Sequence, residues 1–183
     1  MKNIILLLLL TLLSACTTLD AVLSKRGTIN TDISKFDKSK VVRMTPALAN
    51  HGAGYPEFGL YWEGKYGDHA RLVVQMKRAA NFSRSESLEI IIDGDKLVLK
   101  PVQPSDFGGL AYNPIIRKNI SEKDFIITKK QILKIANGKE GGYRLHLLRT
   151  YIDGDINYTY QNYKTYLPKP FKEFYNIVWG NTK

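Results

Sequence analysis

The stretch "SLEIIIDGDKLVLKP", residues 87–101, contains two apolar runs separated by Asp93-Gly94. Asp-Gly is a strong signal for the two-residue type I′ turn of a β-hairpin, because that turn needs positive φ at both central residues. A slip of one residue would send every side chain to the opposite face of the hairpin. The pattern therefore predicts a hairpin with one buried face, on which the facing pairs are Ile92–Asp95, Ile90–Leu97 and Leu88–Leu99.

The tripeptide Asp-Gly-Asp, present at residues 93–95, occurs again in "HLLRTYIDGDINYTYQ", residues 146–161. A second turn at Asp153-Gly154 predicts the facing pairs Tyr151–Ile156, Arg149–Tyr158 and Leu147–Tyr160, with Tyr158 and Tyr160 packed in the core. Paired carboxylates beside glycine also suggest calcium, but an EF-hand loop needs oxygen ligands at positions 1, 3 and 5, glycine at 6 and glutamate at 12. Neither stretch has that spacing, so we expect two turns and no bound metal.

Other segments predict further strands and two helices. Residues 57–64, "EFGLYWEG", and 70–78, "ARLVVQMKR", alternate apolar and polar side chains, as half-buried strands do. Residues 41–44, "VVRM", predict a shorter strand that Pro46 should end. Thr128 and Gln131 form a capping-box pattern before a helix that Asn137-Gly138 should end. Pro170 suits the first position of a C-terminal helix with an apolar stripe, made of Phe171, Phe174, Tyr175, Val178 and Trp179.

These elements predict an α+β fold made mainly of antiparallel strands, a sandwich or curled sheet with β-hairpins plus two short helices. We expect a single globular domain over residues 39–183. Residues 16–38 lack sustained periodicity and are mostly small or polar, which is typical of a tether.

The N-terminus is typical of an export signal. Lys2 precedes an apolar run over residues 4–13, which is too short to cross a bilayer as a retained helix. Leu13-Ser14-Ala15-Cys16 follows it and resembles the lipobox of bacterial lipoproteins. The resemblance implies that residues 1–15 are removed and that Cys16, the chain's only cysteine, carries the lipid. Because Thr17 rather than aspartate follows, the resemblance implies the outer membrane of a Gram-negative cell, with a Gram-positive surface as the alternative.

The chain has a formal net charge of +10, and removal of Lys2 with the signal would leave +9. An exported, anchored protein would meet anionic lipid, lipopolysaccharide, peptidoglycan or another envelope protein rather than nucleic acid. Scattered lysines that favour solubility are the alternative explanation, since no run of five or six like charges occurs. If the charge forms one patch, its expected members are Arg71, Lys77, Lys129, Lys130 and Lys134.

No hydrolase, zinc-protease or phosphate-loop motif is present in the sequence. His51, His69 and His146 lie far apart on different predicted elements, and Asp68-His69 suggests a polar turn rather than an acid–base pair. We therefore expect no cofactor and a non-catalytic binding or structural role, either alone or as a subunit of an envelope assembly. An envelope hydrolase acting on cell wall or lipid is the alternative. The candidate ligand contacts are Tyr163 and Tyr166, which lie beyond the predicted strand.

Overall fold

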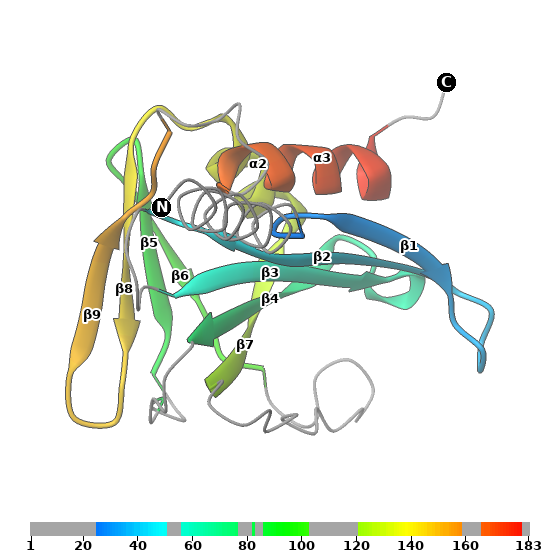
Figure 1. Ribbon diagram of the computed structural model, residues 1–183, viewed down its shortest axis with the longest axis horizontal. Coiled ribbons are helices and arrows are strands. Elements are labelled where there is room, and N and C mark those ends of the chain that lie inside the picture. The colour runs from blue at the N-terminus through cyan, green and yellow to red at the C-terminus, as the bar shows by residue number, and fades with distance from the viewer. Residues whose placement is uncertain are drawn as a thin grey trace, which may run out of the picture.

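The computed structural model describes residues 25–50, 56–76, 82, 86–102, 121–158 and 166–180. Within these ranges the chain forms nine β-strands in two antiparallel sheets and two α-helices (Figure 1). The second helix lies near the C-terminus. The α+β class predicted from the sequence is confirmed.

One sheet has five strands, in the spatial order β1 (Ile29–Ile33), β2 (Lys40–Leu48), β3 (Glu57–Glu63), β4 (His69–Met76) and β7 (Ser121–Thr128). The predicted alternation is confirmed, because Phe58 and Leu60 of β3 and Leu72 and Val74 of β4 are buried on its inner face. A short 3-10 helix, η1 (Gly64–Tyr66), follows β3.

Two features of this sheet differ from the expectations. β1 lies inside the segment expected to be a tether, and it pairs with β2 from Ile29–Met44 to Ile33–Lys40. The folded part of the chain therefore begins before residue 39. The prediction that Pro46 ends the next strand was wrong, because β2 continues to Leu48. Its register shifts between Met44 and Ala47, and such an irregularity accommodates a residue that lacks a backbone N–H.

The other sheet has four strands, in the order β6 (Asp95–Leu99), β5 (Leu88–Ile92), β8 (Gly141–His146) and β9 (Tyr151–Asp155). The predicted turn at Asp93-Gly94 is confirmed: φ is 51° at Asp93 and 84° at Gly94. The register of β5 with β6 also follows the prediction, from Leu88–Leu99 to Ile92–Asp95.

The predicted turn at Asp153-Gly154 was wrong. Both residues lie inside β9, where Gly154 faces Tyr143 and Asp153 faces Arg144. The turn between β8 and β9 instead lies at residues 147–150, where Leu147 N donates to Thr150 O at 2.8 Å. The buried Tyr143 ring accounts for the difference: a Cβ built on Gly154 would lie 2.3 Å from the Tyr143 hydroxyl oxygen, so glycine is the residue that fits opposite it.

Both helices form as predicted, with one shifted boundary. At the start of α2 (Lys129–Asn137), Thr128 Oγ1 accepts from Gln131 N at 3.3 Å, and Gln131 Oε1 accepts from Thr128 N at 2.9 Å. α3 (Pro168–Trp179) begins two residues before Pro170 and buries Phe171 and Phe174. α3 packs against α2 and lies over β1, β2 and β3 (Figure 1).

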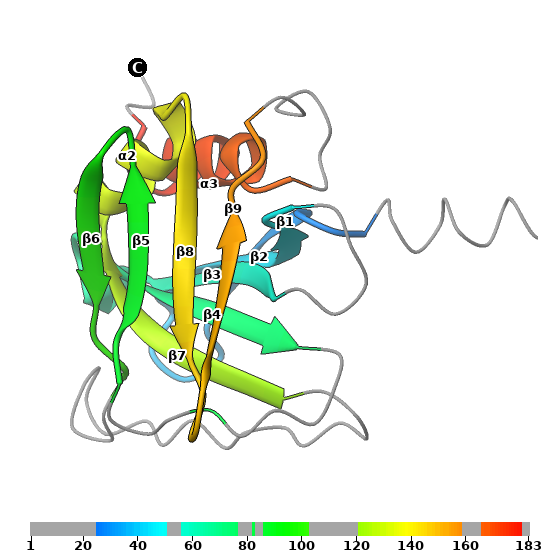
Figure 2. The same ribbon diagram turned by 90° about the vertical axis from the view of Figure 1, so that its left-hand side faces the viewer.

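The two sheets meet beside β7, where Pro101, two residues after β6, bridges to Phe125. Their strands run in clearly different directions (Figure 2). The inner faces of both sheets and the two helices enclose one apolar core. The outer face of the four-stranded sheet points away from this core, which makes it available for a site.

Candidate functional site

The residues expected to contact lipid or ligand are only partly within the described ranges. Cys16, His51 and Tyr163 lie outside them. Tyr166 is only 6% exposed and forms a parallel bridge with Leu48 just before α3. This position packs the ring into the protein, so the structure does not support Tyr166 as a surface contact for a ligand.

The described histidines do not form a catalytic arrangement. His69 is exposed at the start of β4, and the neighbouring Asp68 carboxylate pairs with Lys129 at 3.7 Å. His146 lies at the end of β8, with its ring centroid 6.4 Å from that of Tyr151. Among the described residues, no group of three or more His, Cys, Asp or Glu side chains could hold a metal ion.

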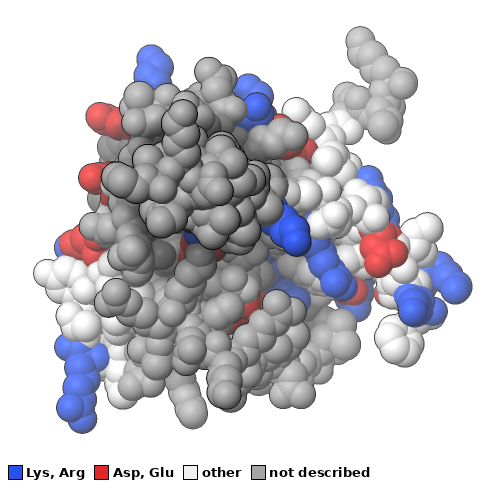
Figure 3. All heavy atoms as spheres, viewed as in Figure 1, with Lys and Arg blue, Asp and Glu red and all other residues white. Residues whose placement is uncertain are grey.

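The expected basic patch is largely neutralised by neighbouring carboxylates. Lys129 pairs with Asp68, and Lys134 of α2 pairs with Asp95 at the start of β6. Lys130 is exposed, whereas Lys77 lies outside the described ranges. Lys and Arg side chains on the face drawn in Figure 3 gather instead at its right-hand end, around the β1–β2 turn.

Arg71, the remaining member of that patch, is also engaged. Its Nη1 lies 3.4 Å from Oδ2 of Asp124, a carboxyl whose pKa is raised to about 6 because it is buried between the strands of the five-stranded sheet. Its guanidinium lies 4.5 Å from the centroid of the Tyr61 ring. These contacts tie β3, β4 and β7 together on the outer face, which is a structural role.

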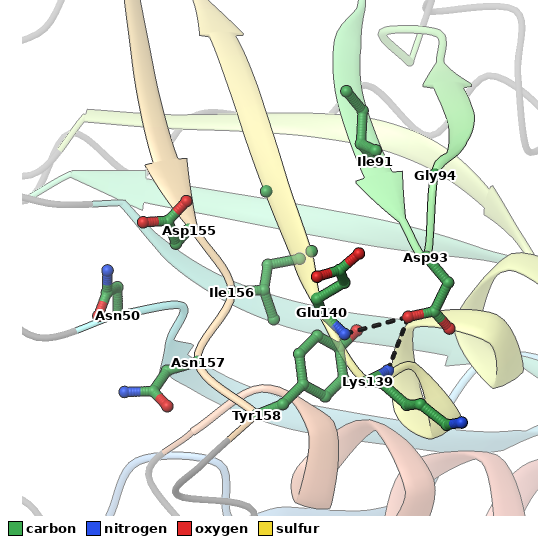
Figure 4. A pocket seen from close by; sticks show the side chains of 12 residues that line it. Asn50, Ile91, Asp93, Gly94, Lys139, Glu140, Asp155, Ile156, Asn157 and Tyr158 are labelled. Carbon is green, nitrogen blue, oxygen red and sulfur yellow. Dashed lines mark hydrogen bonds between the residues drawn. The ribbon is translucent and has the colours of Figure 1, made fainter.

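The most complete candidate site is a hollow of about 660 Å³ at one end of the four-stranded sheet (Figure 4). The register places Ile91, Gly142 and Asp155 in one row across β5, β8 and β9. Because Gly142 has no side chain, the row has a notch between the exposed Ile91 and Asp155. The volume is within the range typical of small-molecule sites, but the hollow is open to solvent rather than enclosed.

Asp93 fixes the wall on the side of the β5–β6 turn. Its Oδ1 accepts hydrogen bonds from the backbone N–H of Lys139 at 2.9 Å and of Glu140 at 3.0 Å (Figure 4). These donors lower the pKa of the Asp93 carboxyl and keep it ionised at neutral pH. Asp93 therefore serves mainly to hold the segment between α2 and β8, and with it the Lys139 and Glu140 side chains.

The opposite wall forms where the chain leaves β9. Ile156 N donates to Gly141 O at 2.8 Å and Asn157 N donates to Ala49 O at 2.7 Å, which brings Asn157 beside Asn50. Tyr158 closes the hollow below, and its hydroxyl donates to Ile135 O at 2.8 Å. Burial raises the pKa of this hydroxyl, so the ring remains neutral.

Three charged side chains remain available to a ligand in this site. The carboxylates of Glu140 and Asp155 and the ammonium group of Lys139 form no hydrogen bond or ion pair with another described residue. Carboxylates accept hydrogen bonds from hydroxyl or amino groups, and amides such as Asn50 and Asn157 both donate and accept. With Ile91 and the Tyr158 ring as apolar surface, the arrangement suits a neutral or amine-bearing polar molecule.

Sequence reasoning missed every residue of this site because they come from four separated segments. The signal that was available is Gly141-Gly142 inside a strand pattern, since glycine in a strand often marks a close approach of backbone or ligand. Gly141 shows the first case: a Cβ there would lie 2.8 Å from Ile91 O. Gly142 forms the floor of the notch.

None of the helices in the described part of the chain is long and apolar enough to span a membrane. No protein-family model, curated protein or solved structure matches the chain.

Proposed function

We propose that this chain is a lipid-anchored envelope protein that binds a neutral or amine-bearing component of the cell wall. The anchor is the lipid that the lipobox-like sequence would place on Cys16, which would make the outer membrane the site of attachment. The binding element is the hollow between β5, β8 and β9. No catalytic step is part of the proposal.

The observation that carries this proposal is the pair of carboxylates around the glycine floor, Glu140 and Asp155, which have no partner among the described residues. A chain with a net charge of +10 attracts polyanions in general, but this hollow has the opposite local character. Its ligand should therefore donate hydrogen bonds rather than carry phosphates. Peptidoglycan fits because its sugars present hydroxyl groups and its peptides present amines.

Calorimetry that measures the affinity of the protein for soluble peptidoglycan fragments tests the proposal. Asp155→Asn or Glu140→Gln should weaken binding about tenfold, because hydrogen bonds to a charged group contribute roughly 1.5–3 kcal/mol and the amide keeps part of each bond. Asp95→Asn is the matched control. It changes the corresponding aspartate of the other Asp-Gly-Asp, which pairs with Lys134 and does not line the hollow.

The control should bind within about twofold of the parent, a difference well below 1 kcal/mol. Equal losses in the Asp95 and Asp155 variants would show that the effect is general electrostatics rather than recognition. Absence of binding by the parent would remove peptidoglycan as the ligand of this hollow.

A further inference from the structure

The turn between β1 and β2 projects from one end of the five-stranded sheet (Figure 1). Phe36 at this turn is 100% exposed, and Ile33 beside it is 62% exposed. Single exposed apolar side chains are common, but apolar side chains exposed together at a projecting turn are typical of a membrane or partner contact. We therefore expect Phe36 and Ile33 to contact an apolar environment outside the domain.

The turn is built to hold this projection. Ser34 N donates to Ser39 O at 2.8 Å, and Lys38 N donates to Ser34 O at 3.1 Å. Lys38 has φ of 58°, and the Asp37 carboxylate accepts from Ser39 Oγ at 2.8 Å and from Ser39 N at 3.2 Å. The hydrogen bond with the Ser34 hydroxyl, together with these two bonds from Ser39, lowers the pKa of Asp37 to about 2 and engages its charge inside the turn.

Lysines surround the exposed apolar side chains. Lys35 and Lys38 are exposed and form no ion pair with a described residue. Lys40 Nζ donates to Ile177 O at 2.9 Å, which brings the partly exposed Ile177 of α3 to the same end of the molecule. Figure 3 shows Lys and Arg side chains at this end, among uncharged side chains and some of Asp or Glu.

We infer that the β1–β2 turn is a second membrane contact, with Phe36 and Ile33 inserted among the lipids and Lys35 and Lys38 at anionic headgroups. An apolar tip bordered by lysines matches the two layers of a bilayer surface, and each lysine near an anionic surface adds to the attraction. The turn would give the domain a second point of contact besides the lipid and so fix its orientation relative to the membrane.

The chain length outside the described residues permits this contact. Nine residue steps separate Cys16 from Lys25, and they span at most about 30 Å when extended. The five residues of β1 span roughly 17 Å. A lipid on Cys16 and the β1–β2 turn can therefore reach the same bilayer. The inference rests on the anchor of the proposed function, but not on its hollow.

The test places an environment-sensitive fluorophore on Phe36→Cys in the mature acylated protein, reconstituted in vesicles of phosphatidylglycerol and phosphatidylcholine. Acylated Cys16 cannot react, so position 36 is the single labelled thiol. The probe should become brighter and be quenched by lipids that carry a spin label in their acyl chains. Leu148→Cys is the control, because Leu148 is 65% exposed in the turn between β8 and β9.

Charge reversal separates headgroup attraction from simple proximity. Lys35→Glu and Lys38→Glu together should shift the probe toward the free state by about fivefold for each lysine. Lys130→Glu with Arg149→Glu, which reverses two exposed charges elsewhere, should leave it unchanged. Ionic strength of ~1 M should act like the first pair, because it shortens the screening length to about 3 Å.

Equal quenching at positions 36 and 148 would overturn the inference, as would a probe at position 36 that stays solvent-exposed in vesicles. Such an exposed tip would leave a protein partner as its occupant. Labelling of the parent protein at Cys16 would instead contradict the lipid anchor, whatever the probe at position 36 reports. The two failures are thus distinguishable.

Discussion

The two Asp-Gly-Asp sequences of this chain adopt different structures within the same sheet. Asp93-Gly94 forms the turn between β5 and β6 with positive φ at both residues. Asp153-Gly154 lies in the middle of β9, facing Arg144 and Tyr143. Their local sequences favour a turn equally, so local propensity does not account for the difference.

The neighbouring strand decides between the two conformations. At Gly94 the space around the Cβ position is open, and glycine is needed there for its backbone conformation. At Gly154 the Tyr143 ring fills that space, and glycine is needed for close approach. Glycine therefore meets two different requirements. Only the requirement at position 154 depends on a residue that is distant in sequence, Tyr143, which lies eleven positions earlier.

Gly154→Ala should have the larger effect on stability. A Cβ at this position would lie 2.3 Å from Oη and 2.5 Å from Cζ of Tyr143, whose ring packs edge-on against Phe58 at 5.2 Å between centroids. Overpacking of this kind costs about 1–3 kcal/mol, and we expect the upper part of that range because the ring is buried. Chemical denaturation of the variant measures it.

A double-mutant cycle with Tyr143→Leu tests the cause. If the collision with the ring is the reason, the second substitution should remove much of the cost of the alanine, giving a coupling of about 1 kcal/mol or more. Additive effects of the two substitutions would show that Gly154 matters for another reason.

Gly94→Ala should cost about 1 kcal/mol, because a left-handed conformation is unfavourable for a residue with a Cβ even where no atom is in contact. Gly94→Asn should cost less, since asparagine tolerates positive φ better than alanine does. At position 154 the order should be the opposite, with asparagine costing more than alanine, because asparagine is larger and the Tyr143 ring fills the space. Denaturation of all four variants shows whether the two glycines have different roles; the same order at both positions would contradict that difference.

The first hairpin was predictable because its information is local. Its turn residues and its apolar pairs are adjacent in sequence, and the observed register follows them. The capping box of α2 is local in the same sense. The second hairpin was not predictable from its own residues, because the competing turn at residues 147–150 carries no Gly, Pro, Asn or Asp signal. Tyr143, which selects the observed register, lies outside the stretch that suggested the turn.

The candidate site was beyond sequence reasoning for a related physical reason. Asn50 follows β2, Ile91 belongs to β5, Glu140 precedes β8 and Asp155 ends β9. Their proximity depends on the pairing of β5, β8 and β9 and on the hydrogen bond from Asn157 N to Ala49 O. The second Asp-Gly-Asp thus contributes Asp155 to the site only because it is not a turn.

The smallest expected effect concerns the first aspartate of each tripeptide in acid. Both carboxyls have lowered pKa values in the folded protein, Asp93 because it accepts from the N–H groups of Lys139 and Glu140, and Asp153 because it accepts from Arg144. A carboxyl with a lowered pKa stabilises the fold above its unfolded pKa of about 3.9 and loses that contribution as pH falls through the folded value. Melting temperature should therefore fall between roughly pH 4 and pH 2. Asp93→Asn and Asp153→Asn should each make this fall smaller, and each should change the stability less than either glycine substitution does.

Salt separates the two causes. The ion pair of Asp153 with Arg144 is exposed and should be screened at ~1 M ionic strength, where the Debye length is about 3 Å. The hydrogen bonds from backbone N–H groups to Asp93 should persist. High salt should therefore remove the difference between the parent and Asp153→Asn while leaving the difference between the parent and Asp93→Asn. If salt removed both differences equally, the two aspartates would be stabilised in the same way, and the contrast between a backbone clamp and an ion pair would be lost.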